Sequence, residues 1–169
     1  MTEKLFRLDN RTALVTGASR GLGRRFALAL AKAGADVVLA ARDSKRLEEV
    51  ADEVISLGGK AFPAVMDVTD RSSIEEAYSL AEGALGPIRI VVNNSGIAIT
   101  KRLLDVSEAE WDPVIDVNLT GAWVVAQTAA KAMVAHGLGG SIINISSILG
   151  QRTNPGIIAY NAAKAGLDH

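Results

Sequence analysis

Cysteine is absent from this 169-residue chain, and histidine nearly so. Without cysteine the chain can form no disulfide, no thiolate nucleophile and no cysteine-ligated metal site. Only two imidazoles are present, His136 and His169, so a metal centre built from histidines is not expected either. We therefore assign no metal ligands, and we look for chemistry carried by oxygen and nitrogen groups.

Two further absences exclude classes of partner. The formal net charge is only −1, so we expect no basic surface that would attract nucleic acid or an anionic membrane. No uninterrupted apolar run approaches the ~18 residues of a membrane helix, and residues 1–10 lack the apolar stretch of a signal peptide. These features predict a soluble, cytoplasmic protein.

Apolar residues make up 49% of the chain, enough for one sizeable core in a single domain over residues 1–169. Short β-branched segments alternate with helical patterns, which is typical of βαβ units around a parallel sheet. Pro63 lies in the third expected strand, and proline cannot donate to a strand ladder, so this strand should be an edge. A Rossmann-type, doubly wound α/β sheet of order 3-2-1-4-5 places it there.

Three helix starts are predicted from capping patterns. Ser44 can cap the second helix, and Ser72 with Glu75 forms a capping box for the third. Asp112 followed by Pro113 is typical of an N-cap and first helical residue, and it predicts the start of the long helix before strand five.

A glycine-rich turn follows the first expected strand, 12–15. Gly17 permits a tight turn, Gly21 lets the backbone approach a ligand, and Gly23 permits close packing of helix on strand. A strand, this turn and a helix together direct free N–H groups and a helix N-terminus at a phosphate. The alternative is a glycine-rich loop without a ligand, which the flanking strand and helix disfavour.

Tyr160 and Lys164 are four residues apart in an expected helix, so their side chains share one face. An ammonium beside a phenol lowers the phenol's pKa and suits it to proton transfer. Taken alone, such a pair is more often an ordinary surface contact.

Several motifs together resemble the short-chain dehydrogenase/reductase family. The chain carries Thr-Gly-x-x-x-Gly-x-Gly at 16–23, Asp67-Val68 after strand three, and Asn-Asn-Ser-Gly at 93–96, where the family has alanine in place of Ser95. Asn118 follows, then Ser147 thirteen residues before Tyr160, and finally Tyr-x-x-x-Lys. The resemblance covers about residues 11–167, and the combination is highly specific.

The resemblance implies catalytic roles. Tyr160 would protonate the forming alkoxide, or accept its proton in the reverse direction, and Lys164 would favour phenolate and bind the nicotinamide ribose. Ser147 would hydrogen-bond the substrate oxygen where charge develops. Asn118 would hold a water that links Lys164 to solvent. Ser146 is the rival for the serine role, and we expect it to bond backbone instead.

The resemblance also implies a set of cofactor-binding residues. They lie in the glycine turn, at the ends of the following strands and on the last helix: Gly17, Ser19, Arg20, Gly21, Leu22, Gly23, Arg42, Asp67, Val68, Asn94, Gly96, Tyr160 and Lys164.

The end of strand two indicates which dinucleotide is preferred. An NAD site needs a carboxylate there for the adenine ribose, but this chain has Ala41 followed by Arg42. Arg42 and Arg20 could bind a ribose 2′-phosphate through charge-assisted bonds, so NADP is predicted over NAD. Asp43 supports the NAD alternative, because it could pair with an arginine or reach a ribose.

The leading hypothesis is an NAD(P)-dependent oxidoreductase that interconverts a ketone and a secondary alcohol. The alternative is a truncated dinucleotide-binding module without turnover, because relatives have later strands that cover the substrate. The substrate is not specified, although sugar acids and 3-oxoacyl compounds both fit the resemblance. The family commonly forms dimers or tetramers, so a homo-oligomer is expected, with a tetramer favoured and with 126–132 and 162–167 at the contact.

Overall fold

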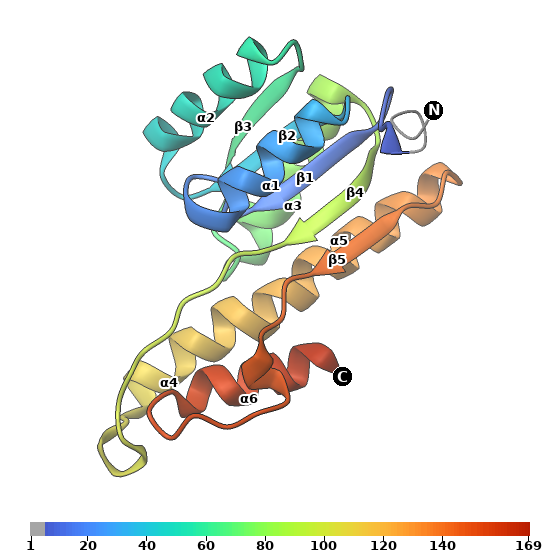
Figure 1. Ribbon diagram of the computed structural model, residues 1–169. Coiled ribbons are helices and arrows are strands. Elements are labelled where there is room, and N and C mark those ends of the chain that lie inside the picture. Colours follow the sequence, from blue (N-terminus) through green and yellow to red (C-terminus); the bar gives the residue numbers. More distant parts are fainter. Residues whose placement is uncertain (1–5) are drawn as a thin grey trace.

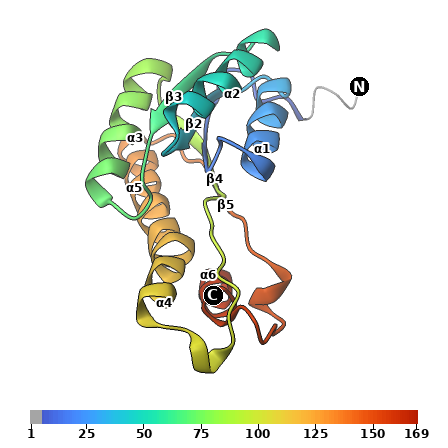
Figure 2. The ribbon, with the colours of Figure 1, turned by 90° about the vertical axis from the view of Figure 1, so that its left-hand side faces the viewer.

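The computed structural model describes residues 6–169, which form a parallel sheet covered by helices on both faces (Figures 1 and 2). The strands are β1 (Thr12–Thr16), β2 (Asp36–Ala41), β3 (Ala61–Val65), β4 (Ile88–Asn93) and β5 (Ser141–Asn144). The α-helices are α1 (Gly21–Lys32), α2 (Ser44–Ser56), α3 (Arg71–Leu85), α4 (Glu108–Ile115), α5 (Gly121–His136) and α6 (Ile158–Asp168). Short 3₁₀ or π turns complete the chain: η2 (Leu103–Asp105), η3 (Asp116–Thr120) and η4 (Ile148–Gly150).

The strand order is β3-β2-β1-β4-β5, with every neighbouring pair parallel, which confirms the Rossmann-type prediction. Pro63 lies opposite Leu39 of β2, in the edge strand that its missing N–H predicts. The carboxyl ends of the parallel strands meet at one end of the sheet, where ligands bind in folds of this kind.

Alternating side chains of the strands fill two cores. Leu14 and Val38 pack toward α3 and α5, whereas Val15, Val37 and Leu39 pack toward α1 and α2. The central strand β1 is buried at every residue, and β2 is buried at all but its two end residues, as expected for a parallel sheet covered on both faces. Figure 2 shows the two helical layers on either side of the sheet.

Two predicted helix caps are wrong by one or two residues. Asp43, not Ser44, caps α2 and accepts from the backbone N–H of Arg46 at 3.2 Å. Asp70, not Ser72, caps α3 and accepts from the Ser72 N–H at 2.9 Å. In both cases a carboxylate precedes the serine, and an ionised acceptor is favoured at the positive end of the helix dipole.

The predicted start of the long helix is also wrong. Helix α4 begins at Glu108, and Ser107 with Glu110 forms a capping box ahead of it, so Asp112 and Pro113 lie inside the helix. Proline there removes one backbone hydrogen bond. The chain continues through the π turn η3 into α5, rather than in one regular helix.

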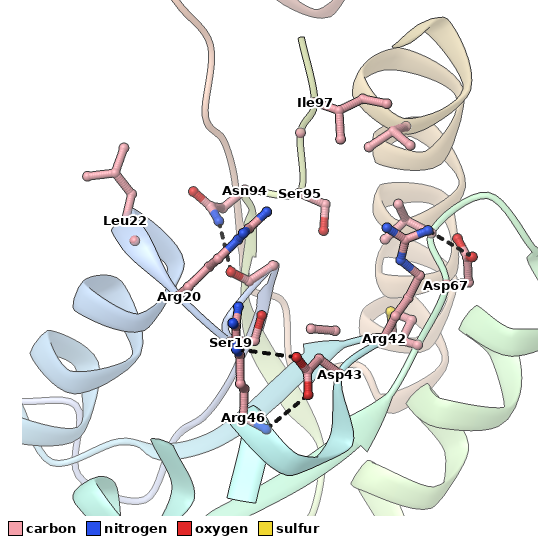
Figure 3. A pocket seen from close by; sticks show the side chains of 17 residues that line it. Ser19, Arg20, Leu22, Arg42, Asp43, Arg46, Asp67, Asn94, Ser95 and Ile97 are labelled. Atoms are coloured by element: carbon pink, nitrogen blue, oxygen red, sulfur yellow. Dashed lines mark hydrogen bonds and ion pairs between the residues drawn. The ribbon is translucent and has the colours of Figure 1, made fainter. Parts of the chain in front are cut away.

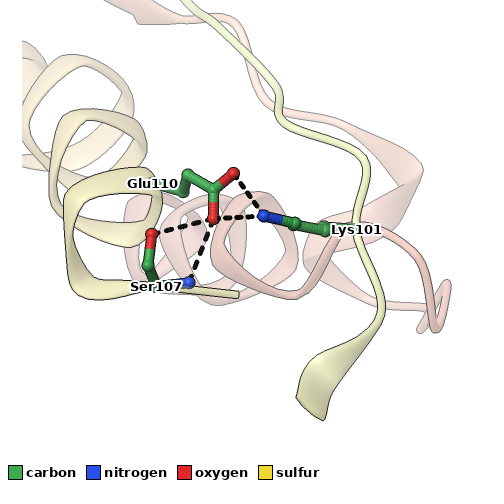
Figure 4. A network of polar contacts seen from close by, with 3 residues as sticks. All are labelled: Lys101, Ser107 and Glu110. Atoms are coloured by element: carbon green, nitrogen blue, oxygen red, sulfur yellow. Dashed lines mark hydrogen bonds and ion pairs between the residues drawn. The ribbon is translucent and has the colours of Figure 1, made fainter. Parts of the chain in front are cut away.

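The segments after β4 and β5 carry α4 and α6 beyond the end of the sheet, in the lower part of Figure 1. The two segments are joined by a hydrogen bond from the Lys101 N–H to the Gly156 carbonyl, at 2.7 Å. Lys101 Nζ also contacts both carboxylate oxygens of Glu110, at 2.7 and 2.9 Å (Figure 4). Within residues 6–169, none of the helices combines the length and the apolar character needed to cross a bilayer.

Candidate active site

The glycine turn after β1 has the close packing that its sequence predicts. Gly17 and Gly21 have φ of +65° and +58°, a region that favours glycine. A Cβ on Gly23 would collide with the Gly17 carbonyl and would lie 2.6 Å from Asn94 Nδ2. Any larger residue at position 23 would therefore separate α1 from β1.

Helix α1 starts inside this turn without a side-chain cap. Its N-cap residue is Arg20, which makes no capping hydrogen bond, so the first N–H groups of the helix lack a side-chain acceptor. Their partial positive charge is a binding feature for an anion such as a phosphate.

Thr16 and Asn94 fix the ends of β1 and β4 to each other. Thr16 Oγ1 accepts from the N–H groups of Asn94 and Ser95, each at 3.0 Å. Asn94 Nδ2 donates to the Thr16 carbonyl, also at 3.0 Å. The role of Thr16 in holding two strand ends together was not predicted, although it belongs to the motif at 16–23.

A pocket of about 610 Å³ lies over the carboxyl ends of the strands, and we call it the sheet-end pocket (Figure 3). Ten predicted cofactor residues line it: Gly17, Ser19, Arg20, Gly21, Leu22, Arg42, Asp67, Val68, Asn94 and Gly96. The other three, Gly23, Tyr160 and Lys164, are not among its lining residues.

Seven lining residues were not predicted to bind the cofactor: Ala41, Asp43, Arg46, Met66, Ser95, Ile97 and Val117. Most adjoin predicted positions at a strand end. Arg46 is different, because it reaches the pocket from the first turn of α2. Its position three residues after Asp43, at the start of the helix, is the signal that could have found it.

Charged groups collect at the β2–β3 end of the pocket. Arg42 Nη1 lies 3.8 Å from Asp67 Oδ2, and Arg46 Nε lies 3.4 Å from Asp43 Oδ2. The hydrogen bond from the Thr69 N–H, helped by the Thr69 hydroxyl and the Arg42 charge, lowers the pKa of Asp67. Asp67 is therefore ionised at neutral pH.

The four predicted catalytic residues, here the candidate catalytic group, come from three separate segments. Asn118 lies in η3, Ser147 immediately precedes η4, and Tyr160 with Lys164 lies on α6. Helix α6 packs against both η3 and η4, so the fold brings the three segments together.

Lys164 is buried on α6, with 5% of its surface exposed. Its Nζ donates to the Ile145 carbonyl at 2.7 Å and lies 5.5 Å from the centre of the Tyr160 ring. Burial lowers the pKa of Lys164, and the Asp168 carboxylate opposes this shift. The predicted pair is thus a buried cation next to a phenol, not a solvated surface contact.

Asn118 connects the candidate catalytic group to the sheet-end pocket. Its Nδ2 donates to the carbonyls of Ile97 and Val114, each at 2.8 Å. Its Oδ1 is buried and accepts no hydrogen bond from the described residues. A Cβ on Gly96 would lie 2.7 Å from this oxygen, so any larger residue at position 96 would collide with Asn118.

Of the two neighbouring serines, Ser146 differs from expectation in its hydrogen bonding. Ser147 Oγ accepts from the Leu149 N–H at 3.2 Å, which leaves its hydroxyl proton available. Ser146 Oγ is buried and contacts no partner in the described part of the chain, so the backbone bond predicted for it is not formed. The physical reason is local geometry: Ser147, not Ser146, is the N-cap of η4.

Comparisons with known proteins identify the family. The sequence model of the short chain dehydrogenase family matches residues 11–169. A 3-oxoacyl-(acyl-carrier-protein) reductase of Thermotoga maritima is 38% identical over 95% of this chain and 65% of that enzyme.

Solved structures agree. A short-chain type dehydrogenase/reductase from Mycobacterium marinum is 42% identical, with a TM-score of 0.96 over 99% of this chain and 66% of that one. A gluconate 5-dehydrogenase from Burkholderia cenocepacia, in complex with NADP and tartrate, is 36% identical, with a TM-score of 0.93 over 99% of this chain and 65% of that one. The chain spans about 63% of the length of the curated relatives that it matches. By sequence and by fold, the chain belongs to the short-chain dehydrogenase family.

Proposed function

We propose that the protein is an oxidoreductase that interconverts a ketone and a secondary alcohol with NADP. One observation carries the proposal: Lys164 is buried beside Tyr160, at 5.5 Å from the ring centre, and its ammonium is held by the Ile145 carbonyl. A buried ammonium is costly, so its position next to an acid-base side chain supports a chemical role.

The sheet-end pocket fits a dinucleotide. The uncapped start of α1 would bind the pyrophosphate, Asp67 would accept from the adenine, and Asn94 and Gly96 would border the nicotinamide end. Its volume of about 610 Å³ lies within the range of cofactor sites. When bound, the nicotinamide supplies or accepts the hydride.

The candidate catalytic group would handle the proton. Tyr160 lies beside the buried Lys164 ammonium, so its phenol would donate a proton to the forming alkoxide or accept one in the reverse direction. Ser147, whose hydroxyl proton is not used by the contact with Leu149, can donate to the substrate oxygen. Asn118 Oδ1 is free to accept from a water that leads toward Lys164.

NADP is favoured over NAD by charge at the end of β2. Ala41 supplies no carboxylate, Arg42 follows it, and both Arg42 and Arg20 of the glycine turn line the pocket. Arginine binds phosphate through forked, charge-assisted hydrogen bonds. The NADP complex of the Burkholderia enzyme is consistent with this preference.

The substrate we propose is a hydroxy or oxo compound with an acidic or acyl chain. The named relatives act on gluconate and on 3-oxoacyl groups, and both chemistries interconvert an alcohol and a ketone.

A dinucleotide-binding module without turnover is the second candidate. It is favoured by the observation that none of the candidate catalytic group is among the residues that line the sheet-end pocket. Cofactor binding and chemistry could therefore be separable in this chain.

We further propose that the protein is a homo-oligomer, with a tetramer favoured. Of the two stretches expected at the contact, 126–132 and 162–167, Ala126, Gly166 and Leu167 line a groove of about 420 Å³, and Trp123 in the same groove is 53% exposed. Light scattering tests the assembly, and a stable active monomer would contradict it.

The activity is tested by mixing the protein with NADPH and a panel of sugar-acid and 3-oxoacyl ketones and following the loss of cofactor absorbance. We expect oxidation of NADPH with at least one ketone and none without substrate. Saturable NADPH binding with no oxidation across the panel would instead favour the module without turnover.

A further inference from the structure

Arg46 and Asp43 form a charged pair at the sheet-end pocket that the proposed function has not used. Both line the pocket, and Arg46 Nε lies 3.4 Å from Asp43 Oδ2. In Figure 3 the Arg46 side chain rises from α2 toward the turn that carries Ser19. The Arg46 side chain is about half exposed, so the guanidinium N–H groups that do not face Asp43 can donate to a ligand.

Arg42 and Arg46 stand on opposite sides of the end of β2. Arg42 is directed toward Asp67, 3.8 Å away at the end of β3, whereas Arg46 is directed toward the glycine turn (Figure 3). Ala41, the last residue of β2, also lines the pocket and offers no carboxylate. Two guanidinium groups that flank the end of a strand can bind one phosphate from two sides.

Asp43 is also held in place because it caps helix α2. Its Oδ1 caps α2 by accepting from the Arg46 N–H at 3.2 Å, while Oδ2 faces the Arg46 guanidinium. The carboxylate therefore cannot move away without uncapping the helix. A dianionic phosphate beside Arg46 would be repelled by Asp43, whereas a ribose hydroxyl could donate to it.

We propose that Arg46 is a specificity-determining residue for the 2′-phosphate of NADP, and that Asp43 limits the preference by pairing with it. The pair thus sets how strongly the pocket distinguishes NADP from NAD. This inference rests on the proposed function, because it requires the pocket to bind a dinucleotide.

Calorimetric titrations with NADP and with NAD, in the absence of substrate, test how Arg46 and Asp43 affect the affinity for each cofactor. Arg46→Gln should lower the affinity for NADP at least about tenfold, since one charge-assisted contact to the phosphate is lost. It should lower the affinity for NAD less than about twofold. Asp43→Asn should raise the affinity for NADP roughly threefold, because asparagine still caps α2 and no longer repels the phosphate.

Lys45→Gln is the matched control. Lys45 is exposed, adjacent to Arg46 and absent from the pocket lining, so its loss removes the same charge without a contact. We expect its ratio of NADP to NAD affinity to match that of the parent protein, because solvent and salt screen a charge without a direct contact.

The titrations distinguish failure of the proposed function from failure of the proposal for Arg46. If the parent binds neither dinucleotide, the proposed function is wrong, and this inference is wrong with it. If the parent binds NADP, three results would contradict the proposal: an unchanged ratio of NADP to NAD affinity in Arg46→Gln, an equal loss of affinity for both cofactors, or a change no larger than in Lys45→Gln. Each would show that Arg46 does not contact the 2′-phosphate. Retained NAD binding by Arg46→Gln shows that the variant is folded.

Discussion

The glycine turn beside the sheet-end pocket is shaped by backbone, whereas the candidate catalytic group is built by side chains from three distant segments. In the turn, Gly17 and Gly21 have positive φ, Gly23 lies close to the Gly17 carbonyl, and α1 begins without a side-chain cap from Arg20. In the catalytic group, Asn118 Oδ1 is buried and accepts no hydrogen bond from residues 6–169, and the Lys164 ammonium is desolvated. The first region therefore depends on backbone geometry, and the second depends on buried polar and charged side chains.

This difference implies that substitutions in the two regions should have different consequences. A side chain added in the glycine turn should affect binding, because it moves backbone. A polar atom removed from the catalytic group should affect the rate, because it changes proton transfer and leaves the pocket intact.

The largest expected effect is on turnover. Tyr160→Phe removes the phenol that lies over Lys164, so turnover should fall by at least about 10³-fold, on the order of 4 kcal/mol of barrier. The NADPH oxidation assay measures this, with Ser146→Ala as a control outside the proposed proton path. A Phe variant that kept most of its activity would show that another group is the acid.

A smaller effect is expected on cofactor choice within the pocket. Ala41→Asp with Arg42→Ala supplies the missing carboxylate and removes a cation, so the ratio of NADP to NAD affinity should fall at least about tenfold. Titration of both cofactors on both proteins measures the ratio. Equal weakening of both would mean that Arg42 does not contact the 2′-phosphate.

The desolvation of Lys164 predicts a pH dependence of stability. Because its folded pKa is lowered, the unfolded chain binds the extra proton between the folded value and about 10.4. The free energy of unfolding of the parent, relative to Lys164→Met, should therefore rise with pH across that alkaline window. Urea unfolding at several alkaline pH values measures the difference, and a flat or falling difference would contradict a desolvated lysine.

The smallest effect concerns the tie between the segments that carry α4 and α6. Hydrogen bonds from Lys101 and Ser107 lower the pKa of Glu110 from 4.5 to about 2. Any stability that Glu110 contributes is fully present above the unfolded pKa and is lost as pH falls through about 2. Relative to Glu110→Gln, the parent's melting temperature should be slightly higher at neutral pH, and this excess should vanish near pH 2. An excess that persists there would mean that the carboxylate's charge is not the cause.

The sequence predicted the glycine turn and the edge strand better than it predicted the helix starts. Glycine spacing and Pro63 restrict the backbone directly, so the turn and the edge strand could be foreseen. Aspartate and serine are both good caps, so neighbouring candidates such as Asp43 and Ser44 differ only in local backbone that the sequence does not specify.

Tertiary contacts explain the other misses. The π turn that contains Asn118 packs against α6, a helix that lies far away in sequence. Arg46 lines the pocket because α2 packs beside β2, and the local pattern that points to it is its place three residues after Asp43.

One measurement tests the separation of binding from chemistry most directly: the NADPH affinity of Gly23→Ala beside that of Tyr160→Phe, by calorimetry without substrate. A Cβ at position 23 would meet the Gly17 carbonyl and Asn94, so we expect at least about a hundredfold loss of affinity in Gly23→Ala. Tyr160→Phe should bind within about twofold of the parent, because the phenol acts on the proton. Equal loss in both variants, or tight binding by Gly23→Ala, would contradict the account.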